Sequence, residues 1–259
     1  MLTVNLELNR YFTTFSHANH PIIIYDKITK MYNFLKLDNK TLLSEEWFLD
    51  HKGPCEKIIP VKRKDGLWYF LKENGNFLFE RAFKDAWRFA EDLALVQLEM
   101  NSFNFLKLDG TFLSKENFYY ATTFWNGFAS VFRAEKGWNF LKKDGTFLCD
   151  NYFLDVENFE NGFAKVKTDD ERWNFVKEDG TIIRVEEELV KIENFSEDFA
   201  CVCRADGKWN YIDVNGKVIS EEWYSQANNF VNGLGLVMRD NYEYNYMTPS
   251  GKVLLAEWL

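Results

Sequence analysis

The chain is a tandem repeat with a period of 35 or 36 residues. An aromatic-Asn-aromatic-aliphatic motif recurs, and its second position is occupied by Asn33, Tyr69, Asn104, Asn139, Asn174, Asn210 and Asn245. A second motif, Phe-x-x-Gly/Asp-Phe/Leu-Ala-x-Val, keeps the same period at Phe89, Phe124, Phe159 and Phe195, with a variant at Phe230. Two columns in one register identify seven repeats, which we number from the one that contains Asn33. Because each unit of a repeat array packs on its neighbours, this periodicity constrains every further inference about the fold.

The pattern within one repeat predicts an antiparallel β-meander. In repeat five, residues 162–167 alternate with period two and residues 173–177 are rich in aromatic and β-branched side chains, as is typical of strands. Asp179 and Gly180 form the signal of a tight hairpin turn, so residues 181–184 are expected to be a third strand. A connecting segment follows, and Ser-Glu-Glu at 44–46 predicts a single helical turn within it.

We therefore predict an all-β fold of seven antiparallel β-meander repeats in an open, solenoid-like array, with little helix. A seven-bladed β-propeller is the alternative, although the repeat is shorter than the ~40–50 residues of ordinary four-stranded blades. Residues 1–19 are expected to be an N-terminal leader that caps the array, and residues 20–259 a single repeat domain. The repeated tryptophans, such as Trp138 and Trp173, are expected to fill the interfaces between repeats.

The asparagine column stands between aromatic residues although asparagine is unfavourable in strands. We interpret it as an internal ladder, in which each side-chain amide bonds backbone groups of an adjoining repeat or turn. A row of polar contacts to a ligand is the alternative interpretation.

Composition excludes several classes of function. The net charge is −9, which argues against nucleic acid because binding to phosphates needs a basic surface. No apolar segment approaches the length of a membrane span, and no signal peptide is evident. The four cysteines, Cys55, Cys149, Cys201 and Cys203, show no disulfide-framework spacing, which favours free thiols and a cytoplasmic location.

We find no pattern of residues that predicts catalysis, a metal site or a cofactor. His17 and His20 have a metal-like spacing, but no further ligand stands near them in the sequence. The recurrent carboxylates Asp109, Asp144 and Asp179 belong to Asp-Gly turns, where they have a structural role. The sequence therefore predicts a protein that is not an enzyme.

The repeats resemble the WG-repeat (KWG-repeat) family of bacterial proteins. The resemblance rests on Gly-Lys-Trp-Asn-Tyr-Ile-Asp at 207–213, Asn-Gly-Lys-Val-Ile at 215–219 and the Phe-x-x-Gly motif at 159–166. It extends from about residue 20 to residue 259 and is weakest in repeats one and two. The resemblance implies an all-β scaffold that acts as an interaction module, without catalytic residues that could be transferred to this chain.

Three aromatic residues are the candidate binding site. Trp87, Tyr120 and Trp125 occupy columns in which other repeats carry polar residues such as Glu157, Asp155 and Glu160. A column that tolerates charge faces solvent, so the three rings are expected to be exposed, and exposed aromatic clusters are typical of binding surfaces. We expect a scaffold for protein–protein interaction or assembly, and the alternative is a carbohydrate-binding module that uses these aromatics.

Overall fold

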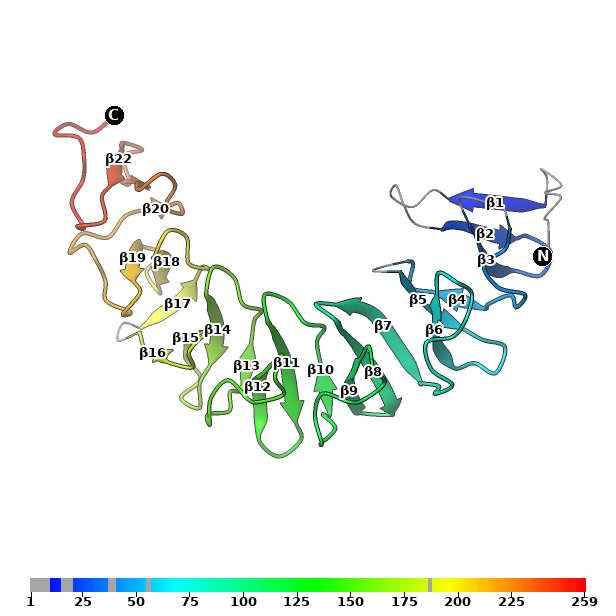
Figure 1. Ribbon diagram of the computed structural model, residues 1–259. Coiled ribbons are helices and arrows are strands. Elements are labelled where there is room, and N and C mark those ends of the chain that lie inside the picture. Colours follow the sequence, from blue (N-terminus) through cyan, green and yellow to red (C-terminus); the bar gives the residue numbers. More distant parts are fainter. Residues whose placement is uncertain (1–9, 15–20, 37–40, 55–56, 186–187) are drawn as a thin grey trace. The chain divides into compact units, whose positions relative to one another are not determined.

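The computed structural model describes residues 10–14, 21–36, 41–54, 57–185 and 188–259. Over these residues the chain forms twenty-two strands and no helix. The strands make seven separate antiparallel sheets, one for each repeat, and Figure 1 shows them in sequence order. None of these sheets closes on itself. The predicted all-β class, with tandem antiparallel repeats, is confirmed.

Six sheets have three strands and the sheet of repeat five has four. In repeat order they are β1 (Tyr11–Thr14), β2 (Ile22–Asp26) and β3 (Met31–Leu35); β4 (Asp50–His51), β5 (Ile58–Lys62) and β6 (Trp68–Lys72); β7 (Asp85–Ala90), β8 (Leu93–Glu99) and β9 (Ser102–Lys107); β10 (Tyr120–Ala121), β11 (Phe128–Arg133) and β12 (Gly137–Lys142); β13 (Asp155–Val156), β14 (Phe163–Lys167), β15 (Trp173–Lys177) and β16 (Ile182–Ile183); β17 (Leu189–Ile192), β18 (Phe199–Arg204) and β19 (Trp209–Asp213); and β20 (Gln226–Ala227), β21 (Gly235–Met238) and β22 (Tyr244–Met247).

The third strand of the meander differs from the expected one. The segment after the Asp-Gly turn is a strand only in repeat five, as β16, and elsewhere it makes single bridges such as Leu141 to Phe147. The connecting segment instead supplies a short edge strand, for example β13, which pairs with β14. The helical turn expected at 44–46 is also wrong, because the Ser44 hydroxyl accepts the NH of Glu46 at 3.1 Å within a bend. A short loop with such local bonds satisfies its backbone without helix.

The Phe-x-x-Gly motif forms a two-residue hairpin turn. Asn126 and Gly127 have φ angles of 49° and 83°, and a turn of the I′ type requires positive φ at both central residues. Repeat three has Glu91 and Asp92 at these positions, with φ angles of 52° and 68°. Asparagine and glycine adopt a positive φ at the lowest cost in free energy. Their recurrence in the motif therefore reflects the backbone conformation of this turn.

The glycine of the Asp-Gly turn is required for two reasons. Gly180 has a φ of +86°, which disfavours a side chain. A Cβ at this position would also lie 2.8 Å from the carbonyl oxygen of Leu148 in the preceding repeat. The second hairpin turn is thus one of the places where successive repeats approach each other through their backbones.

The hydrophobic core lies between the sheets of successive repeats. One cluster combines Phe175 and Ile183 of repeat five with Phe195, Ala200 and Val202 of repeat six. Each repeat covers its neighbour, which is how units too small to fold alone become stable.

The role expected for the repeated tryptophans is wrong in part. The side chain of Trp138 is only half-buried, whereas Phe140, two residues later on the same strand, is completely buried. Trp173 likewise packs at the margin of the cluster around Phe175. In these two repeats the phenylalanine fills the interface and the tryptophan covers its edge, whereas Trp68 of repeat two is buried in the core.

The chain divides into two compact units, Met1–Ala134 with Lys143–Gly145, and Glu135–Lys142 with Thr146–Leu259. Strand β1 lies within the expected leader and pairs with β2, so this part of the leader belongs to the first sheet. Residues 1–9 and 15–20, and Cys55, lie outside the described residues. Over the part of the chain that is described, no helix could cross a membrane. Cys149, Cys201 and Cys203 are free thiols.

Candidate binding surface

Two of the three predicted aromatics lie on either side of one buried ring. Trp87 is on the edge strand β7, and its ring centroid is 6.2 Å from that of Phe103 on β9. Tyr120, on the edge strand β10, makes an edge-on contact with the same Phe103 at 5.8 Å. The Tyr120 side chain is 52% exposed, Trp87 is half-buried and Phe103 is buried. The expected exposure is therefore found for Tyr120, but the Trp87 ring is partly covered.

A lysine continues this row of rings toward repeat two. The Lys52 Nζ atom lies 4.7 Å from the centroid of the Trp68 ring and 5.3 Å from that of Trp87. It also forms an ion pair of 3.4 Å with Asp85. Cation–π contacts and the ion pair fix the ammonium group between two repeats. We call Lys52, Trp68, Trp87, Phe103 and Tyr120 the edge-strand cluster.

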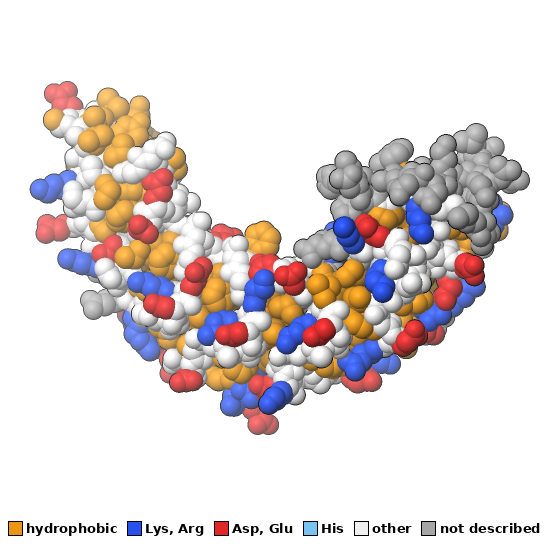
Figure 2. Space-filling model, in the orientation of Figure 1, with side chains coloured by type: hydrophobic (Ala, Val, Ile, Leu, Met, Phe, Trp, Pro, Cys, Tyr) orange, Lys and Arg blue, Asp and Glu red, His pale blue; other side chains and the backbone are white. Residues whose placement is uncertain are grey.

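Trp125 lies apart from the edge-strand cluster. It directly precedes the turn at Asn126 and Gly127, pairs with Phe128 across that turn, and is 58% exposed. Among the described residues no ring contact is found between Trp125 and Trp87 or Tyr120. On the face shown in Figure 2, hydrophobic side chains are exposed between charged ones in the region of β7 to β10. The candidate site thus consists of a cluster and a separate exposed ring.

The asparagine column is structural. Asn139 Nδ2 donates to the carbonyl oxygens of Cys149 and Asn151 at 2.8 and 2.9 Å, and its Oδ1 accepts the NH of Phe140 at 2.7 Å. The same pattern occurs at Asn33 and other members of the column. These asparagines are buried, so they cannot form a row of ligand contacts. The internal ladder is confirmed, with one correction: the bonded carbonyls belong to the same repeat and not to an adjoining one.

The pKa shifts of the ionisable groups near the repeats have structural causes, namely hydrogen bonds within turns and burial. Hydrogen bonds from the hydroxyl and NH of Thr111 hold the pKa of Asp109 below its usual value, and Thr181 does the same for Asp179. Burial lowers the pKa of His51, which packs edge-on against ring neighbours. Within the described ranges, no three His, Cys, Asp or Glu side chains gather as metal ligands. The turn carboxylates thus have the structural role expected from the sequence.

Sequence reasoning missed the side chains that link successive hairpin turns. The Glu91 carboxylate accepts the NH of Gly127 at 3.0 and 3.2 Å, 36 residues further on. The Glu197 carboxylate accepts the NH groups of Asn232 and Gly233 at 2.8 and 2.7 Å. The signal was present in the sequence, because Glu-Asp stands in these two turns where three other repeats have Asn-Gly.

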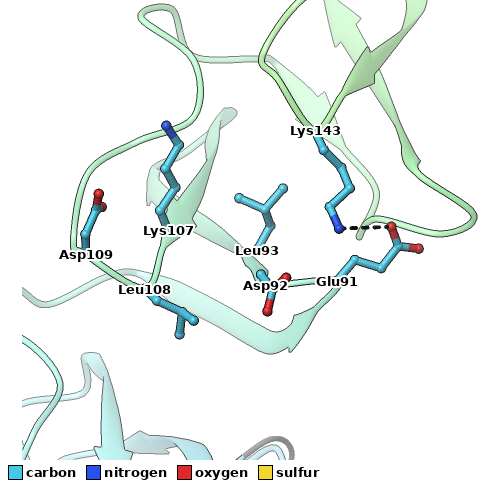
Figure 3. A pocket seen from close by; sticks show the side chains of 7 residues that line it. All are labelled: Glu91, Asp92, Leu93, Lys107, Leu108, Asp109 and Lys143. Atoms are coloured by element: carbon cyan, nitrogen blue, oxygen red, sulfur yellow. Dashed lines mark ion pairs between the residues drawn. The ribbon is translucent and has the colours of Figure 1, made fainter.

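The first of these turns lies beside a cleft in the first unit. Its volume is about 360 Å³, and it is lined by Glu91, Asp92, Leu93, Lys107, Leu108, Asp109 and Lys143. Lys143 Nζ lies 3.9 Å from Glu91 Oε2. Figure 3 shows Lys107 and Lys143 on opposite sides of Leu93. The cleft therefore combines an apolar floor with a rim of both charges.

Comparison with known proteins gives one family match. The family described as WG containing repeat matches residues 70–99, from strand β6 to strand β8. No curated protein matches the sequence. Among solved structures, the computationally designed Ika8 protein shares 10% identity over 94% of this chain and 85% of that chain, with a TM-score of 0.38. BamB from Moraxella catarrhalis shares 10% identity over 89% and 82%, with a TM-score of 0.37. Apo AztD from Citrobacter koseri shares 11% over 95% and 85%, with a TM-score of 0.40.

Proposed function

Because residues 70–99 match the family described as WG containing repeat, we propose that the chain is a non-catalytic scaffold that binds a protein partner through the exposed aromatics of its first unit. One observation carries the proposal. Tyr120 and Trp125 expose about half of their side chains at positions where other repeats carry polar residues. Large exposed aromatic rings are enriched among the residues that dominate protein interfaces.

The surroundings of these rings also support a protein partner. The rings of the edge-strand cluster come from the sheets of repeats two, three and four, and Lys52 and Asp85 give the cluster a charged margin. An apolar centre with a polar margin is the usual composition of a protein interface. The buried thiols of Cys201 and Cys203 support a reducing compartment such as the cytoplasm as the place where it acts.

Glycan binding is the second candidate. The specific observation in its favour is that the half-buried Trp87 ring lies beside the polar groups of Lys52 and Asp85. A mostly apolar surface with a few placed polar groups is typical of small-ligand sites. The function of Tyr120 would then be to extend the surface for a second sugar ring.

The test is a comparison of two immobilised proteins. We expect the parent to retain a specific protein from the native lysate, and the double variant Tyr120→Gln/Trp125→Ser to lose it. Both replacements are the residues of other repeats, Gln226 and Ser196, so stability should stay within about 1 kcal/mol of the parent. Tyr242→Asn is the matched control, because Tyr242 is an exposed tyrosine of the other unit.

The outcomes separate the candidates. Retention by the parent and by the Tyr242 variant, with loss in the double variant, supports the proposal. Binding of a polysaccharide with the same dependence on Tyr120 and Trp125 would support the glycan alternative. If the parent and the double variant retain the same protein equally well, the exposed aromatics are not the binding surface.

A further inference from the structure

The cleft beside Leu93 lies in the first unit, and the proposed function does not use it. Leu93 is the buried first residue of β8, and it forms the floor of the 360 Å³ cleft between the Glu91–Asp92 turn and the Asp109–Gly110 turn. Leu108 contributes a second apolar side chain, which is partly exposed. The cleft is therefore open to solvent and apolar at its base.

The other repeats show what normally occupies this place. The position of Leu93 is phenylalanine in repeats four, five and six. Phe163 stacks on Phe195 with a centroid separation of 4.0 Å, and Phe199 stacks on Phe230 at 4.3 Å. Leucine has no ring to stack in this way, so repeat three lacks the aromatic ring that the sheets of repeats five and six place here.

The charges on the rim are not equally engaged. The Glu91 carboxylate bonds Gly127 and faces Lys143. Asp109 is engaged by Thr111. Lys107, by contrast, makes no ion pair with a carboxylate of the described residues, although its charge helps to lower the pKa of the neighbouring Asp109. Its ammonium group is the charge on the rim that is available to a ligand.

We propose that this cleft binds an aromatic side chain that is followed by a carboxylate, as in a peptide segment with Phe next to an acidic group. The ring packs on Leu93 at the base of the cleft, and the carboxylate pairs with Lys107. The peptide nature of the ligand rests on the proposed function. Glu91 joins the cleft to the turn that follows Trp125, so a partner bound at Trp125 would pass close to this place.

The probe is N-acetylphenylalanine, titrated by ligand-observed NMR, with N-acetylphenylalaninamide as its uncharged analogue. We expect saturable binding by the parent with a Kd in the millimolar range, as is usual for a ligand of this size. Leu93→Phe should weaken binding by about tenfold or more, since the new ring fills the cleft. Leu234→Phe is the matched control, because it makes the same change in repeat seven, and it should leave the affinity within about twofold.

The charge is tested separately. Lys107→Gln, and the amide in place of the acid, should each weaken binding by roughly two- to fivefold, as expected for a solvent-exposed ion pair. If Leu93→Phe changes the thermal unfolding of the protein, the proposal is tested by the Lys107→Gln variant and the amide analogue instead. No saturable binding by the parent, or equal binding by the Leu93 and Leu234 variants, would overturn the proposal. If the parent captures its protein partner through Trp125 but does not bind N-acetylphenylalanine, the cleft proposal is wrong and the proposed function still stands.

Discussion

The hydroxyl group of Tyr211 occupies the space that an alanine methyl group fills in repeats three to six. A Cβ on Gly235 would lie 2.5 Å from Tyr211 Oη. Between repeats five and six the corresponding pair is Phe175 and Ala200, which pack in one core cluster. The Tyr211 hydroxyl lies 2.7 Å from the carbonyl oxygen of Asn228, to which it donates. The exchange of Phe and Ala for Tyr and Gly is thus one compensated change across an interface between repeats.

This pair predicts a strong coupling between two substitutions. Gly235→Ala alone should destabilise the protein by about 1–3 kcal/mol, because it overpacks a filled site. Tyr211→Phe alone should cost about 1 kcal/mol, since the Asn228 carbonyl loses its donor. The double variant should be more stable than the sum of both changes by at least about 1 kcal/mol, as measured by urea denaturation. Strict additivity would show that the two groups do not compete for space.

The asparagine ladder predicts that replacing one of its side chains by alanine strongly lowers the free energy of unfolding. Asn139→Ala removes one acceptor and two donor bonds, so the buried NH of Phe140 and the part-buried carbonyls of Cys149 and Asn151 lose this side-chain partner. We expect a loss of about 2–5 kcal/mol in the free energy of unfolding. Asn194→Ala is the control, because its amide bonds an exposed carboxylate and should cost less than about 1 kcal/mol. Equal effects of the two variants in urea denaturation would contradict the role of the ladder.

The different burial of Phe140 and Trp138 predicts that their replacement by alanine lowers the stability by different amounts. Phe140→Ala should cost about 3–5 kcal/mol, because the ring is completely buried against Phe159 at a centroid distance of 4.9 Å. Trp138→Ala should cost less, about 1–3 kcal/mol, since the indole is only half-buried and its site stays open to water. The comparison uses denaturant midpoints of both variants. A larger loss at Trp138 would restore the tryptophan column as the main filler of the interfaces.

The ion pair of Arg10 and Asp26 predicts a dependence of stability on pH. The guanidinium group donates to Asp26 at 2.8 and 3.2 Å, and these hydrogen bonds hold the pKa of the buried carboxyl well below its usual value. A depressed pKa contributes stability above the unfolded-state value of about 3.9, and this contribution is lost as the pH falls further. The difference in Tm between the parent and Asp26→Asn should therefore be largest near neutral pH and shrink below about pH 4. A constant difference from neutral to acidic pH would contradict this assignment.

The candidate site could be predicted only in part. The columns that tolerate charge correctly indicated that Tyr120 and Trp125 are exposed. The same reasoning failed to predict the half-buried state of Trp87, because its contacts with Phe103 across the sheet and with Lys52 of the preceding repeat form only when the strands and repeats are packed. The cleft at Leu93 was also missed, since a leucine in a phenylalanine column is an ordinary exchange until its surroundings are known.

The number of repeats, their antiparallel β structure, the Asp-Gly hairpin turn and the internal asparagine ladder could be predicted from the sequence alone. These features are decided locally, because strand periodicity, positive φ at Gly180, and the bonding needs of an amide act within one repeat. The packing of the repeats was needed to show which segment supplies the edge strand, which aromatic fills the interface and where a cleft remains. Those outcomes depend on how neighbouring sheets share volume and polar groups, as at Tyr211 and Gly235, and such complementarity exists only once the sheets are packed.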